Sequence, residues 1–96
     1  MVHEEVDMFE AVQSLDSRQQ PGSPIRETIL GTFDTEDDAI EAARAARAAF
    51  FEGDGTDFAW WIVRPVGAKL AHWISDSNSD KEFVLDLRSG QLVEQR

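Results

Sequence analysis

The sequence predicts an α+β domain in which a mainly antiparallel sheet of about four or five strands carries one long helix on one face. Short segments rich in β-branched and aromatic residues alternate with clusters of Gly, Pro, Asn, Asp and Ser, which is typical of strands joined by turns. One alanine-rich segment, residues 35–51, has helical spacing. With 96 residues the chain has room for a single domain, 1–96, and we expect residues 1–6 to be disordered. The predicted order is β-β-α-β-β-β.

The first predicted element, MFEAVQSL, fits two periods. The spacing of Phe9, Ala11 and Leu15 suits a strand, whereas Met8, Val12 and Leu15 equally suit one face of a helix. We interpret the segment as a strand because the next block is a strand and a turn-rich loop joins the two, as in a hairpin.

Residues 25–33 are rich in β-branched side chains and predict the second strand. Strict alternation would place Ile25, Ile29, Gly31 and Phe33 on one face of this strand.

Residues 35–51 predict the helix. Thr35 suits the N-cap, with Asp38 three residues later, and the first turn is acidic, which matches the positive end of the helix dipole. We expect Gly53 to end the helix in the left-handed conformation. The predicted inward face consists of Ala39, Ala43, Ala46 and Phe50, and the predicted outward face of Glu41, Arg44, Arg47 and Ala48.

Residues 58–64 and 69–74 predict a hairpin whose first strand is apolar on both faces. Such a strand is typical of a central position covered on both sides. Residues 82–87 alternate, and we expect Phe83, Leu85 and Leu87 to point toward the core. Beyond a turn at Gly90, the chain ends in a short segment, QLVE.

The run LGTFDT at residues 30–35, followed by Ala39 and an alanine-rich helix, resembles part of the plant ethylene-response-factor DNA-binding domain. In that family such a run closes a three-stranded sheet and opens a helix packed on it, so the resemblance implies a hairpin followed by a helix. The family's basic, tryptophan-bearing strands have no counterpart, because the corresponding stretch carries Glu10, Asp16 and Glu27. DNA binding is therefore not implied.

The chain is acidic, with 19 Asp and Glu against 9 Lys and Arg and a net charge of −10. Residues 1–57 carry 14 acidic and 4 basic side chains, whereas residues 58–96 carry 5 of each. Such a field repels nucleic-acid phosphates and anionic lipids, so we expect neither nucleic acid nor membrane as a partner. It favours basic partners, cations or simply solubility.

No cysteine is present, which excludes disulfides, thiolate zinc sites and cysteine nucleophiles. The start, MVHEEVDMFE, lacks the basic and apolar regions of a signal peptide, and no apolar run approaches the ~20 residues that span a bilayer. We expect a cytoplasmic protein without a cofactor.

Three tryptophans, Trp60, Trp61 and Trp73, fall in the predicted hairpin. If Trp60 and Trp73 face the helix, Trp61 faces away, or the reverse, because one helix covers only one face of a sheet. The second face then needs the N-terminal segment, a curled sheet or a second chain. Together with His72, these residues are the candidate binding residues, for a protein partner or for a second copy of the chain.

Two polar patterns suggest other chemistry. Asp76, Asn78 and Asp80 match the opening of a calcium loop, but the sixth position is Lys81 and the twelfth is Leu87, where the motif needs Gly and Glu. A hairpin loop whose side chains bond their own backbone is the alternative.

His72 could act as a base if a carboxylate such as Asp86 approached it from a paired strand. The alternative is a half-buried histidine on a sheet face.

The leading hypothesis is a non-catalytic binding or protein-interaction module. The first alternative is a small enzyme or metal-dependent protein that uses His72 with Asp76, Asp80 or Asp86. The second alternative is an acidic mimic or neutraliser of a basic partner, with its acidic residues at the start of the helix.

Overall fold

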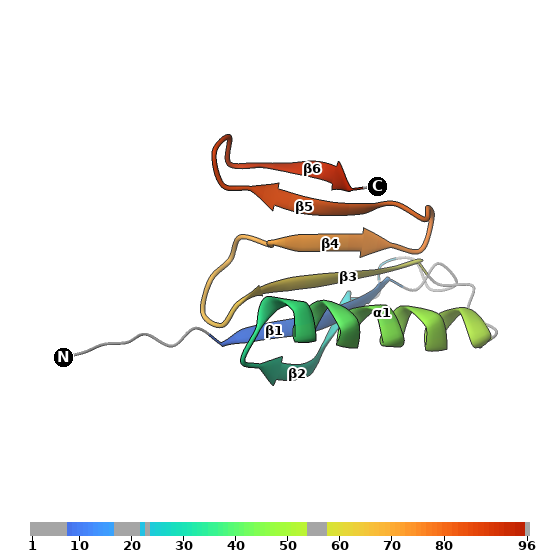
Figure 1. Ribbon diagram of the computed structural model, residues 1–96. Coiled ribbons are helices and arrows are strands. Elements are labelled where there is room, and N and C mark those ends of the chain that lie inside the picture. The colour runs from blue at the N-terminus through green and yellow to red at the C-terminus, as the bar shows by residue number, and fades with distance from the viewer. Residues whose placement is uncertain (1–7, 17–21, 23, 54–57, 96) are drawn as a thin grey trace.

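The computed structural model describes residues 8–16, 22, 24–53 and 58–95, and within them the α+β class and the predicted order of elements are confirmed. One helix lies across one face of an antiparallel sheet (Figure 1). The described sheet has six strands instead of four or five, because the C-terminal segment forms a full strand. Residues 1–6, for which we expected disorder, lie outside the described residues.

Every neighbouring pair of strands is antiparallel, in the spatial order β2-β1-β3-β4-β5-β6. The helix follows β2 and returns the chain to the other side of β1, which places β1 between β2 and β3. The elements are β1 (Phe9–Asp16), β2 (Arg26–Phe33), α1 (Glu36–Glu52), β3 (Phe58–Pro65), β4 (Trp73–Asp76), β5 (Glu82–Asp86) and β6 (Gln91–Gln95). The strand interpretation of the first segment is therefore confirmed.

The start of α1 is as predicted and its end is not. The Oγ1 of Thr35 accepts the backbone N–H of Asp38 at 3.1 Å, so Thr35 is the N-cap. Gly53 has φ −91°, an extended conformation, so the predicted left-handed cap is wrong. The last turn tightens instead, because the Gly53 amide donates to the Phe50 carbonyl, three residues back.

Two large indoles packed against alanines form the core between α1 and the sheet. Trp61 and Trp73 are 0% and 1% exposed. The side chains facing them are small, which lets the helix approach the sheet closely. These fully buried small residues are Ala11, Ala39, Ala43 and Ala59. Of the predicted inward face of the helix, Ala46 and Phe50 are partly buried at the margin.

The strand registers decide which tryptophans share a face. Trp73 lies opposite Val63, two residues from Trp61, so Trp61 and Trp73 both face the helix and Trp60 faces away. Both arrangements that we predicted put Trp73 on the same face as Trp60, so both are wrong. The second strand of this hairpin also begins at Trp73, because residues 66–72 form the connection, with Gly67 at φ 88°.

Two further facial assignments were wrong. In β5, Val84 lies opposite Trp73 and packs on the core, whereas Phe83 and Leu85 point to the other side of the sheet, and Leu87 is 81% exposed beyond the strand.

In β2, a bulge lets Ala11 pair with Gly31 and Val12 with Ile29. The extra residue reverses the alternation, so Ile29 leaves the face that Gly31 occupies.

Two arginines that we predicted to point outward form hydrogen bonds from the helix to neighbouring parts of the sheet. Arg44 forms two hydrogen bonds with the Glu82 carboxylate, at 2.9 and 2.7 Å. Arg47 donates to the backbone carbonyls of Asp76 and Ser79. Arginine stems are long enough to reach over one strand, so both side chains tie α1 to β5 and to the loop before it.

The two adjacent tryptophans of β3 should differ sharply in their contribution to stability. Trp61→Ala should lower the free energy of unfolding by about 3–5 kcal/mol, because it removes a fully buried indole. Trp60→Ala should cost about 1 kcal/mol, because Trp60 is only partly buried. Urea unfolding followed by far-ultraviolet circular dichroism measures both, and equal losses would contradict this assignment of faces.

Candidate binding face of the sheet

The face of the sheet opposite α1 carries a row of apolar side chains that crosses all six strands. No described element packs over this face, because α1 lies against the other side of β1, β2 and β3. We call it the open face. By strand register its apolar members are Val12, Ile29, Phe58, Trp60, Ile62, Ile74, Phe83, Leu85 and Leu92.

Burial is graded across the open face. Val12, near its centre, is fully buried. Trp60, Ile62 and Ile74 are partly exposed, and Ile29, toward the β2 edge, is 56% exposed. Contiguous apolar surface that water still reaches is uncommon on proteins that work alone.

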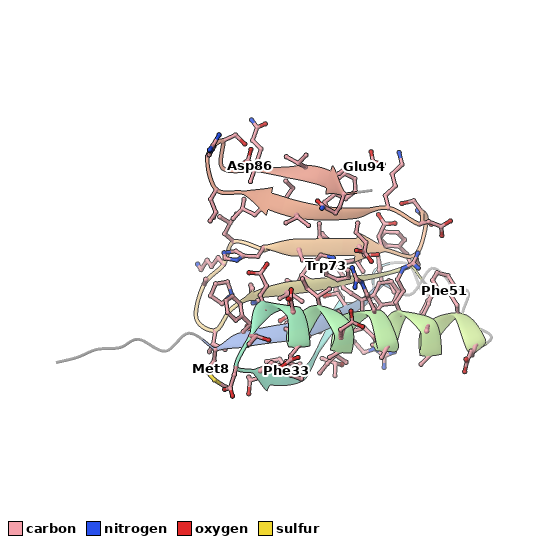
Figure 2. All side chains as sticks on the ribbon, in the orientation of Figure 1. Met8, Phe33, Phe51, Trp73, Asp86 and Glu94 are labelled. Carbon is pink, nitrogen blue, oxygen red and sulfur yellow. The ribbon has the colours of Figure 1, made fainter. Side chains whose placement is uncertain are left out.

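The part of the sheet formed by β5 and β6 projects beyond the helix (Figure 1). Trp73 lies at the helix, whereas Asp86 and Glu94 lie clear of it (Figure 2). All five residues of β6 are exposed. The apolar row therefore continues past the layer that α1 covers.

A pocket of about 310 Å³, open to solvent, lies on the open face and is lined by Phe58, Trp60, Ile74 and Asp76. Phe58 and Trp60 are two residues apart on β3, so their rings lie side by side, with centroids 5.4 Å apart and planes tilted by 40°. Asp76 lies directly opposite Trp60 on β4. We call this the Trp60 pocket.

Charges on the open face are predominantly acidic around this pocket. Asp16 lies opposite Phe58 on β1. Glu27 lies opposite Ser14, which itself lies opposite Trp60. Asp76 and Asp16 therefore flank the two aromatic rings by register, and Glu27 lies one strand further away on the same face.

Two basic side chains among the described residues of the open face are paired with carboxylates. Arg64 donates to Glu10 at 2.6 Å, and both are largely buried, with 20% and 10% of their side chains exposed. Lys81 lies 3.7 Å from Glu94. Arg64 and Lys81 therefore pair with Glu10 and Glu94, not with Asp76 of the pocket.

The candidate calcium loop bonds its own backbone. The Oδ1 of Asp76 accepts the amides of Asn78 and Ser79, at 2.9 and 3.2 Å, and the hydroxyl of Ser79 accepts the amide of Lys81. The carboxylate of Asp80 lies 3.8 Å from Arg47. Among the described residues, no group of three or more His, Cys, Asp or Glu is placed to hold a metal ion.

The structure places His72 beside a carboxylate that sequence reasoning did not select. Its Nδ1 lies 3.3 Å from the Oε1 of Glu36, in the first turn of α1, and its ring lies 6.1 Å from that of Phe9. Both neighbours belong to the covered side of the sheet, away from the Trp60 pocket. Asp86 instead accepts the Arg88 amide and the Ser89 hydroxyl in the β5–β6 turn.

A polar network on the covered side was missed from the sequence. Glu82 accepts hydrogen bonds from Arg44 and, at 3.2 Å, from the indole N–H of Trp73. The hydrogen bonds from Arg44 hold the pKa of Glu82 below its ordinary value, against the opposing effect of burial, and raise that of Arg44. Partners 38 residues apart leave no local spacing signal.

This network should make stability depend on pH. Because the pKa of Glu82 is lower in the folded state, its contribution is complete above the unfolded value of about 4.3 and is lost as pH falls through the folded value. Glu82→Gln should lower the free energy of unfolding at pH 7 by about 1–3 kcal/mol and flatten its decline below about pH 4.5.

Urea titrations between pH 7 and pH 3 measure both effects. The matched control is Glu41→Gln, which removes the other carboxylate bound to Arg44, one with 69% of its side chain exposed. This control should cost less than about 0.5 kcal/mol. Equal effects of the two substitutions would contradict the role of Glu82.

Fold and surface together define a two-layer α+β protein with one apolar sheet face that no described element covers. No family model matches the chain, and searches of curated proteins and of solved structures find no significant match. Within the described residues, no helix is long and apolar enough to cross a membrane.

Proposed function

We propose that this protein is a non-catalytic interaction module that binds a basic protein partner through the open face. The observation that carries the proposal is β3, a strand with apolar side chains on both faces, of which the described elements cover one, with α1. Trp61 and Val63 are enclosed by α1, whereas Trp60 and Ile62 stay partly exposed. Partly exposed tryptophan at the centre of an apolar patch is typical of residues that contribute most to an interface.

Charge favours a basic partner over a second copy of the chain. Each copy has a net charge of −10, so apposing two open faces brings like charge together. The Asp76 carboxylate lines the aromatic pocket, and two basic residues described on the face, Arg64 and Lys81, are paired within it. A partner with cationic residues around an apolar centre complements both features.

The acidic start of α1 offers a weaker basis for attracting a basic partner. Its Glu36 lies beside His72 and its Glu41 binds Arg44. The remaining acidic residues of the first turn match the helix dipole. These contacts give the cluster a structural role, whereas the apolar side chains of the open face lack a covering layer among the described residues.

The open face should bind a defined basic, amphipathic peptide. An octapeptide of alternating Leu and Lys should shift the backbone amides of β3 and β4 in ¹⁵N-labelled protein, whereas the same peptide with Glu in place of Lys should not, because of charge repulsion. Ile74→Ser should weaken binding about fivefold or more, since it removes apolar contact area. The matched control, Val93→Ser, changes an exposed residue on the other side of the sheet and should have little effect.

Two results would overturn the proposal. One is a peptide-induced shift confined to the acidic start of α1, or no shift at all, which would show that the open face does not select a basic partner. The other is a stable dimer in sedimentation at micromolar concentration that Ile74→Ser dissociates and Val93→Ser does not, which would assign the open face to a second copy.

A further inference from the structure

We infer that the Trp60 pocket receives an arginine side chain of the partner, with its guanidinium stacked on Trp60 and paired with the Asp76 carboxylate. This inference rests on the proposed function, because the pocket is part of the open face. It adds the chemistry of one contact that would set the register of the partner on the sheet.

The shape of the pocket suits a flat, cationic group on an aliphatic stem. The Phe58 and Trp60 rings, 5.4 Å apart, form an aromatic wall, and Ile74 adds an aliphatic surface. Aromatic faces attract cations through their quadrupole, and tryptophan does so most strongly. The three methylenes of an arginine stem can bury against Ile74 while the planar head lies over the indole.

The carboxylate of Asp76 is held in position before any partner arrives. Its Oδ1 accepts the amides of Asn78 and Ser79, which fixes the side chain in the turn that follows β4. Its backbone carbonyl accepts hydrogen bonds from Arg47, which reaches it from the helix side. A preorganised acceptor loses little conformational entropy on binding, so a cation gains more from it than from a mobile carboxylate.

The same carboxylate argues against a purely apolar occupant. A partner that filled the pocket with leucine or phenylalanine would remove water from Asp76 without replacing its hydrogen bonds, which is costly for a charged group. Asp16, which lies opposite Phe58 on β1, would add to that cost. A cation is therefore selected both by attraction and by the penalty on its competitors.

Arginine fits this open site better than lysine. An ammonium group is strongly hydrated and gains most where aromatic rings enclose it, whereas this pocket has one aromatic wall and is open to solvent. A guanidinium is more weakly hydrated, stacks flat on one ring and forms directional pairs with a carboxylate.

The test uses three peptides of sequence Leu-Lys-Leu-Xaa-Leu-Lys-Leu, with arginine, lysine or the neutral isostere citrulline at the central position. Affinity and site are read from amide shifts and from the Trp60 indole N–H signal of ¹⁵N-labelled protein. The arginine peptide should bind about tenfold more tightly than the citrulline peptide and about threefold more tightly than the lysine peptide. Trp60→Leu should remove most of the preference for arginine.

Two isosteric substitutions separate a local contact from the overall charge. Asp76→Asn keeps an oxygen that accepts the turn amides. It should weaken the affinity for the arginine peptide about fivefold and leave the affinity for the citrulline peptide unchanged. Asp86→Asn is the matched control, because it removes the same charge from a carboxylate that accepts a backbone amide in the β5–β6 turn. It should leave the affinity for both peptides unchanged.

The outcomes also separate this inference from the proposed function. Equal affinity of the arginine and citrulline peptides, or equal effects of Asp76→Asn and Asp86→Asn, would overturn the arginine site while the peptides still shift the open face. Absence of any shift on β3 and β4, with all three peptides, would overturn both. Amide spectra of each variant that match the parent outside the substituted site establish that the fold is intact.

Discussion

A single helix has a fixed width, and that width determines how this sheet is divided into covered and open regions. A helix is about 10–12 Å across and strands lie about 4.8 Å apart, so α1 spans about three strands. Its 17 residues extend about 25 Å, which matches the eight-residue strands β1, β2 and β3 beneath it. Trp73 on β4 and Val84 on β5 still pack against the core at the margin of this layer. No described element packs over the apolar side chains of the second face.

The polar contacts around the core compensate for that limited width. Trp61 donates its indole N–H to Gln13 at 2.7 Å, so a fully buried indole keeps its hydrogen bond. Arg47 lies over the Phe51 and Trp61 rings and binds backbone carbonyls of the loop after β4. Arg44 reaches Glu82 on β5, where the Trp73 indole also donates. Arg44 and Arg47 thus connect the helix to β5, to the end of β4 and to the loop between them, on the covered side of the sheet.

The type of each element could be predicted from the sequence, whereas the register between strands could not. The physical reasons are visible at particular residues. Helix propensity, the Thr35 cap and the two-residue period of β3 are local, so they could be read directly. The face of Trp73 depends on its register with Val63, and the face of Ile29 depends on a bulge. Neither is encoded within one strand, because a shift of one residue exchanges the two faces. The Trp60 pocket was missed for the same reason: its acidic member, Asp76, joins it only through strand pairing.

Net charge connects the exposed apolar surface with its selectivity. An apolar face that no described element covers favours self-association, yet the net charge of −10 on each copy opposes the approach of a second copy. The same field attracts cations, and 14 of the 19 acidic residues precede β3. That part of the chain supplies Asp16 opposite Phe58, and Glu27 one strand further away on the same face. Salt screens this field beyond about 8 Å at physiological ionic strength, so attraction acts at short range, where the apolar surface also begins to lose water. The same negative charge therefore opposes binding of a second copy of the chain and favours binding of a basic protein.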